Sequence, residues 1–150
     1  MDSVLADLDF ACNNITSKSE STRSLVTKYV AFAFKARVAL YEGTFRKYHK
    51  GLNLESSVNG LLTQAAVASK KVMDEGGYKL NDVGGVDKAY RQVFINPAPL
   101  ATEVMLSAVC DLALNNLNDA NWYWTSGTYG DKANFIRTFI NTYLNLDGTP

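Results

Sequence analysis

The chain has 150 residues but only one histidine, two cysteines and three prolines. A single histidine excludes a histidine-rich metal site and gives a Ser-His-Asp triad no support beyond chance. The two cysteines, Cys12 and Cys110, lie far apart and lack metal-ligand spacing. We expect two buried free thiols, with a disulfide left open because the sequence cannot place them side by side. We predict neither a metal site nor a cofactor.

The chain also lacks a charge excess and a long apolar run. Fifteen basic and fifteen acidic residues cancel. This balance argues against nucleic acid or an anionic membrane surface as the main partner, because both need a basic excess. The longest apolar run, residues 30–34, is far shorter than the roughly 18 residues of a membrane span. No signal peptide follows Met1, so we expect any targeting segment to be removed or to lie outside this sequence.

What the chain does contain is a long helical pattern over residues 24–48. Its apolar residues form two stripes at helical spacing, Val26, Tyr29, Ala33, Ala36 and Leu40, and Phe34, Val38, Tyr41, Phe45 and Tyr48. A helix with two apolar stripes packs between neighbours. Gly43 lies inside it and marks either a kink or a close packing contact.

Further helices are predicted before and after this one. Asp2 or Ser3 caps the first, and the third covers residues 57–75 and ends at Gly76-Gly77. Asp87 caps a short helix that ends near Phe94, before a proline-rich stop. The sequence thus predicts a mostly α fold with antiparallel helix pairs of the tetratricopeptide type.

The second part of the chain is less regular. Residues 103–110 fit a strand and a helix equally well, and residues 115–130 read as an irregular segment. Asp131 is expected to cap a last helix with an apolar stripe through Phe135, Phe139 and Tyr143. We therefore expect one fragment over residues 1–150, with a helical repeat region over about 1–96 and an irregular or β-containing segment with a last helix over about 97–150.

The best candidate site is Trp122-Tyr123-Trp124. In an extended segment the two tryptophans would point the same way, about 7 Å apart. Flat aromatic faces next to amide and hydroxyl groups suit sugars, which offer apolar C–H faces and a rim of hydroxyls. Asn121 and Tyr129, with Asn118, Thr125 and Ser126, would supply the polar part. The alternative is that the tryptophans anchor an irregular loop to the helices.

Several segments, in order, resemble the SusD/RagB family of glycan-binding lipoproteins of Bacteroidetes. Residues 5–15 resemble the helix before the family's central repeat. Residues 27–41 are similar to its most recognisable helix, where small residues precede an Ala-Arg-Val-x-Leu-Tyr core, here at 36–41. Residues 65–80 resemble the next helix with its Gly-Tyr. Glu-Val-Met-Leu-Ser at 103–107 resembles the following strand. The ending Asp-Gly-Thr-Pro resembles a family motif, Tyr-x-x-x-Asp-Gly-Thr-Pro.

The resemblance covers nearly all of this chain but only about a third of a typical member, so it implies a central fragment. It implies non-catalytic binding of oligosaccharide or polysaccharide on the outward-facing surface of the outer membrane. The partner would be a SusC-like TonB-dependent transporter, to which members deliver glycan for import. Membrane attachment would come only through a lipid anchor absent from this chain.

Two other functions are left open. The first is a helical scaffold for protein–protein contact without its own sugar site. The second is an acid/base enzyme, which two carboxylates such as Glu103 and Asp111 would require at a separation that sequence cannot show. Arg37 and His49 are expected to be structural, Arg37 as a partner of a carboxylate or helix end and His49 at a helix end.

Overall fold

A computed structural model describes residues 1–130, 134–145 and 147–149. The chain divides into two compact units, Met1–Val109 and Cys110–Pro150. The described residues contain six α-helices, two short 3₁₀ helices and no sheet, and their one β-bridge joins Asp111 to Asn116. The predicted mostly α fold is therefore confirmed.

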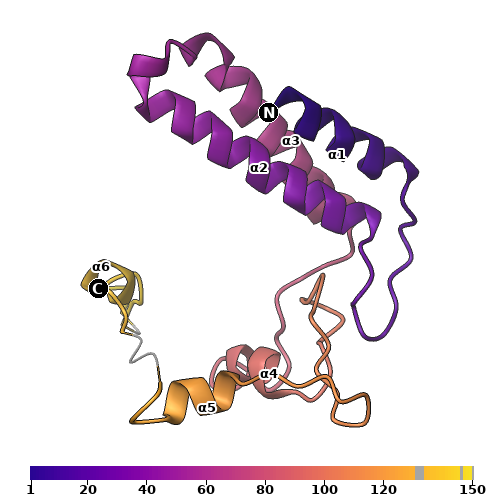
Figure 1. Ribbon diagram of the computed structural model, residues 1–150, viewed down its shortest axis with the longest axis vertical. Coiled ribbons are helices and arrows are strands. Elements are labelled where there is room, and N and C mark those ends of the chain that lie inside the picture. The colour runs from indigo at the N-terminus through magenta and orange to yellow at the C-terminus, as the bar shows by residue number, and fades with distance from the viewer. Residues whose placement is uncertain (131–133, 146, 150) are drawn as a thin grey trace. The chain divides into compact units, whose positions relative to one another are not determined.

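The first unit is built on three helices (Figure 1): α1 (Asp2–Asn14), α2 (Lys28–Tyr48) and α3 (Val58–Glu75). α2 packs against both of the others and forms an antiparallel hairpin with α3 through η1 (Lys50–Leu52) and η2 (Glu55–Ser57). The position of α2 between two helices agrees with the prediction, but the prediction that both apolar stripes are packed is wrong, because Phe34, Tyr41 and Tyr48 of the second stripe are exposed. Helix α3 ends at a glycine pair, as predicted, and Gly77 lies in the left-handed region of backbone conformation, at φ +71°.

Small residues let the three helices approach closely. The core consists of Leu5 from α1, Ala39 from α2, and Leu61 and Ala65 from α3, and Ala39 is completely buried. One turn further along α2, a Cβ placed on Gly43 would lie 2.9 Å from Leu62 Cδ2. Of the two roles open for Gly43, the structure therefore shows close packing.

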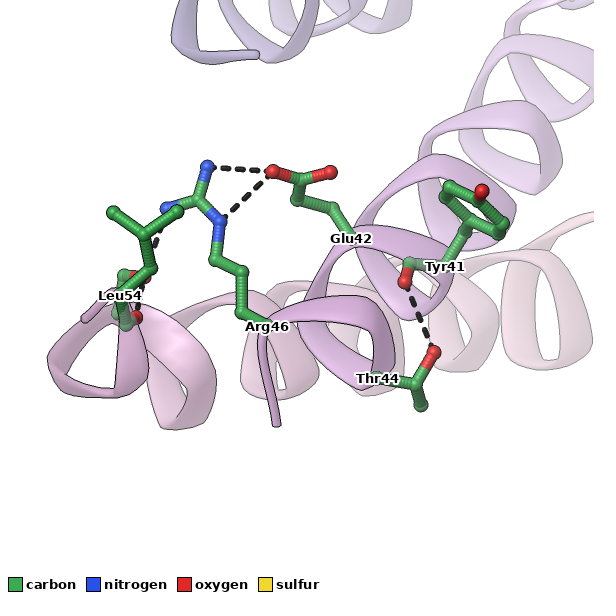
Figure 2. A network of polar contacts seen from close by, with 6 residues as sticks. Tyr41, Glu42, Thr44, Arg46 and Leu54 are labelled. Carbon is green, nitrogen blue, oxygen red and sulfur yellow. Dashed lines mark hydrogen bonds and ion pairs between the residues drawn. The ribbon is translucent and has the colours of Figure 1, made fainter. Parts of the chain in front are cut away.

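A polar network ties the end of α2 to the start of α3 (Figure 2). The Arg46 guanidinium lies 2.7 Å from a carboxylate oxygen of Glu42, and the two side chains are only 14% and 13% exposed. Arg46 also donates a 2.8 Å hydrogen bond to the Ser57 hydroxyl, which in turn donates to the Leu54 carbonyl at 2.7 Å. The network holds the hairpin connection because it satisfies backbone and side-chain groups together.

The loop before α2 explains why this helix begins at Lys28 and not near Ser24 as predicted. The Glu20 carboxylate accepts hydrogen bonds from the backbone N–H groups of Ser24 and Leu25 and from the hydroxyls of Thr22 and Ser24. These bonds fix residues 20–25 in a non-helical loop. Thr27 is extended (φ −104°, ψ 169°), so helical geometry starts after it.

A second set of bonds holds the same loop to a distant segment. The Arg23 guanidinium donates to the Ala101 carbonyl at 2.9 Å. The Ser107 hydroxyl donates to the Thr22 carbonyl at 2.6 Å, and the Ser107 N–H donates to the Arg23 carbonyl at 2.8 Å. Arg23 itself has φ +54°, a strained value for a non-glycine residue. We call these contacts the Arg23–Ser107 clasp.

The rest of the first unit contains one short helix, α4 (Ala89–Ile95). It begins after Lys88, so the predicted Asp87 cap is wrong. Residues 103–110 adopt neither of the two conformations left open, helix or strand. Backbone-directed bonds hold this region together: the Lys79 N–H donates to the Thr102 carbonyl at 2.9 Å, and the Asn81 N–H donates to the Glu103 carboxylate at 2.8 Å.

The second unit contains α5 (Ala120–Thr125) and α6 (Arg137–Ile140). The prediction of a long last helix is wrong for the described residues, because α6 has four residues; the predicted Asp131 cap lies outside them. The apolar side chains of Phe135, Ile136 and Tyr143 are exposed, and a short helix without packing has little to stabilise it.

The two cysteines differ in environment. Cys12 is buried in α1, as predicted, whereas Cys110 is exposed, so that part of the prediction is wrong. Both are free thiols, so the disulfide left open is not formed. Burial raises the pKa of the Cys12 thiol, which keeps it protonated and unreactive.

The core predicts a strong contrast between two leucine truncations. Leu61→Ala removes a side chain that is 5% exposed, whereas Leu40→Ala removes one that is 52% exposed. We expect Leu61→Ala to lower the free energy of unfolding by about 2–3 kcal/mol through lost burial and a cavity, and Leu40→Ala to change it little. Urea titration followed by circular dichroism measures both. Equal effects would contradict the core assignment.

The Glu20 loop predicts a pH dependence. Hydrogen bonds from Thr22, and then from Ser24 and Leu25, lower the pKa of Glu20 from 4.5 to about 2. A lowered folded-state pKa stabilises the loop at neutral pH, and this contribution is lost as the pH falls from about 4.5 towards 2. We expect Glu20→Gln to flatten the pH dependence of stability in this window, measured as the urea midpoint. Glu55→Gln, at an exposed glutamate outside the loop, is the control and should leave that dependence unchanged.

Candidate functional site

The predicted aromatic residues Trp122, Tyr123 and Trp124 all lie on α5. The helix overturns the extended arrangement in which both tryptophans would point the same way. At about 100° per residue, positions two apart on a helix point to nearly opposite sides. Just before the helix, the Asn118 amide oxygen accepts the Ala120 N–H at 3.0 Å in a local turn.

Trp122 instead pairs with Tyr129. Their ring centroids lie 6.1 Å apart with planes 16° from parallel, and the Tyr123 ring lies 6.3 Å from Trp122 at 57°. The loop after α5 folds back because the Ser126 hydroxyl accepts the Tyr129 N–H at 3.1 Å. The structure thus brings together three of the four predicted aromatic residues, and Trp124 stands apart from that stack.

These aromatic side chains are open to solvent. Trp122 is 54% exposed, Tyr123 48%, Trp124 69% and Tyr129 72%. Within the second unit, neither tryptophan is buried. The alternative in which they anchor an irregular loop to the helices stays a prediction. We call Trp122, Tyr123 and Tyr129 the aromatic platform.

The polar residues around the platform are used unequally. The Asn118 side chain already has two hydrogen-bond partners. Its oxygen accepts from the Ala120 N–H, and its amide N–H donates to Cys110 Sγ at 3.1 Å. The Thr125 hydroxyl donates to the Asn121 carbonyl at 2.6 Å. Within residues 1–130, 134–145 and 147–149, the Asn121 side-chain amide has no partner. This amide is therefore free to bind a ligand.

Other candidate residues have structural roles or none. The His49 ring bonds the Phe45 carbonyl at 2.8 Å and stacks on the Phe45 ring at 4.1 Å, as expected at a helix end. Asp9 is paired with Lys35. Arg37 is exposed and, within the described part of the chain, pairs with no carboxylate, so the pairing expected for it is not found there.

The described residues contain no group of three His, Cys, Asp or Glu side chains that could hold a metal ion. The Glu103 carboxylate is engaged by the Asn81 N–H, and Asp111 accepts the Ala113 N–H at 2.7 Å. Both therefore serve the local backbone.

Sequence reasoning missed the pairing of Trp122 with Tyr129. The signal was present, because the two residues are seven apart, which is two helical turns. The intervening Ser126 ends the helix and accepts the Tyr129 N–H, so the same spacing holds across the turn.

Comparisons of the chain with protein-family models, curated proteins and solved structures found no match. None of the helices in the described residues combines the length and the apolar character needed to cross a membrane.

Because the chain has only two tryptophans, its fluorescence reports on α5 alone. Trp122 is the less exposed and is stacked on Tyr129. We expect Trp124→Phe, which leaves Trp122, to be quenched less by acrylamide than Trp122→Phe, which leaves Trp124. Adding Tyr129→Ala to Trp124→Phe should increase the quenching by removing the stacked ring. Equal quenching in all three variants would contradict the stack.

Proposed function

We propose that this chain binds oligosaccharide without catalysis, through the aromatic platform of its second unit. The observation that supports this is the stacked and exposed pair Trp122 and Tyr129. Exposed aromatic rings offer a flat apolar face to the C–H groups of a sugar ring, and stacking keeps that face ordered before a ligand arrives.

Polar groups beside the platform support the same proposal. The Asn121 amide can both donate and accept hydrogen bonds, and the Tyr123 and Tyr129 hydroxyls can do the same. Sugar hydroxyls need such mixed partners, whereas a charged ligand would need an opposite charge. Binding would therefore combine ring stacking with neutral hydrogen bonds.

The cellular setting of this proposal comes from the resemblance to SusD/RagB proteins. On that basis we place the chain at the outward-facing surface of the outer membrane, where it would help deliver glycan to a SusC-like TonB-dependent transporter. A helical scaffold for protein contact is the second candidate, and the open face of α2 favours it.

The proposal predicts that two equally exposed tyrosines differ in importance. Tyr129→Ala removes a platform ring, whereas Tyr48→Ala removes a ring on α2, and the two side chains are 72% and 73% exposed. For the oligosaccharide that binds best among linear glucose, xylose and mannose oligomers, we expect Tyr129→Ala to weaken binding about tenfold. Tyr48→Ala should leave binding unchanged. Isothermal titration calorimetry measures both.

Circular dichroism and the urea midpoint serve as fold controls for these variants. Loss of binding with an unchanged midpoint supports a contact role for Tyr129. If the folded chain binds none of the oligomers, or if Tyr48→Ala weakens binding as much as Tyr129→Ala does, the platform is not the sugar site.

A further inference from the structure

The first unit has an apolar groove that the proposed sugar binding does not use. It lies along α1 and α2 and has a volume of about 690 Å³. Met1 and Val4 line it from α1, and Phe34, Val38 and Tyr41 line it from α2. Phe34 and Tyr41 are more than half exposed, so this face of α2 is covered by neither of its helical neighbours.

A second hollow adjoins the first. It has a volume of about 350 Å³ and lies between Val30 and Ala33 of α2 and the segment at 104–106. Phe34 and Arg37 line both hollows. Arg37 therefore lies on α2 between the apolar groove and this smaller, partly polar hollow, within the same unit.

Arg37 is the one charged side chain that lines either hollow. It is exposed, and within the described residues it forms no ion pair or hydrogen bond. The other polar side chain, Thr44, already donates to the Leu40 and Tyr41 carbonyls at 2.8 and 2.9 Å. An occupant of this face thus meets Arg37 as the one charged side chain among mainly apolar ones.

We propose that this face docks an amphipathic helix of another protein, with two apolar anchors about two turns apart and an Asp or Glu between them. On α2 the lining of the two hollows runs from Val30 to Thr44, which spans roughly 21 Å along the helix axis, the length of a four-turn contact. A carboxylate on the partner would bind the guanidinium through two parallel hydrogen bonds while the anchors fill the hollows on either side.

Two other occupants fit less well. A second copy of this chain, paired face to face about a two-fold axis, would bring Arg37 towards its own copy, and like charges repel. A small anionic amphiphile would pair with Arg37 but fill only one of the two hollows. A helix with a central carboxylate fills both hollows and pairs with the Arg37 guanidinium.

This inference is independent of sugar binding. The groove lies in the Met1–Val109 unit, whereas the aromatic platform lies in the Cys110–Pro150 unit. Failure of one proposal therefore leaves the other standing, and separate variants test them.

The test uses two synthetic helical peptides that differ at one position. Both have leucines seven residues apart; one has Glu midway between them and the other has Lys. We expect the full chain to bind the Glu peptide at least about tenfold more tightly than the Lys peptide, measured by fluorescence anisotropy. Arg37→Glu should reverse the preference. Arg91→Glu, an exposed arginine on α4 outside both hollows, is the matched control and should keep it.

Four results would overturn the proposal. The folded chain could bind neither peptide, or it could bind both equally with no effect of Arg37→Glu, which would mean non-specific apolar adhesion. Sedimentation could show a dimer that Phe34→Ser dissociates, which would make a second copy the occupant. Dodecanoate could bind in an Arg37-dependent manner while the peptides are not discriminated, which would make a small amphiphile the ligand.

Discussion

The close approach of α2 to its neighbours is the constraint on which the first unit depends. Ala39 has no exposed surface, and Gly43 leaves no room for a side chain against Leu62. Larger residues at these two positions would separate the helices and expose Leu5, Leu61 and Ala65. The core is small because its residues are small, so the packing distance, more than the amount of apolar surface, determines whether the hairpin forms.

The distribution of small and large residues around α2 also explains its exposed surface. The small residues are used against α1 and α3, and the large ones, such as Phe34 and Tyr41, are left in contact with solvent. Exposed apolar area of this kind marks a surface that is normally covered. The described residues thus present two exposed surfaces of different chemistry, a helix face with one charged side chain, Arg37, and a neutral aromatic platform.

Elements that depend on a repeated pattern along the chain were predicted, and features that depend on single hydrogen bonds were not. α2 and α3 were predicted because their apolar periodicity extends over several turns. The start of α2 was not, because it depends on a carboxylate that binds backbone N–H groups in the preceding loop. The extended Trp122-Tyr123-Trp124 arrangement was wrong because these residues form a short helix that follows a local turn at Asn118. The pairing of Trp122 with Tyr129 was missed although their spacing of seven was visible, because the turn between them depends on the hydrogen bond from the Tyr129 N–H to the Ser126 hydroxyl.

The Arg23–Ser107 clasp has a consequence for the order in which the first unit folds. Its bonds join residues that are 78 and 85 positions apart in the chain, whereas α2 and α3 are joined by a short connection. Local contacts form early because they require little loop closure, and distant ones form late. We therefore expect the helical hairpin to fold first and the clasp to close on an already formed α2. Contacts made after the rate-limiting step slow unfolding without speeding folding, so we expect the clasp to prolong the lifetime of the folded unit.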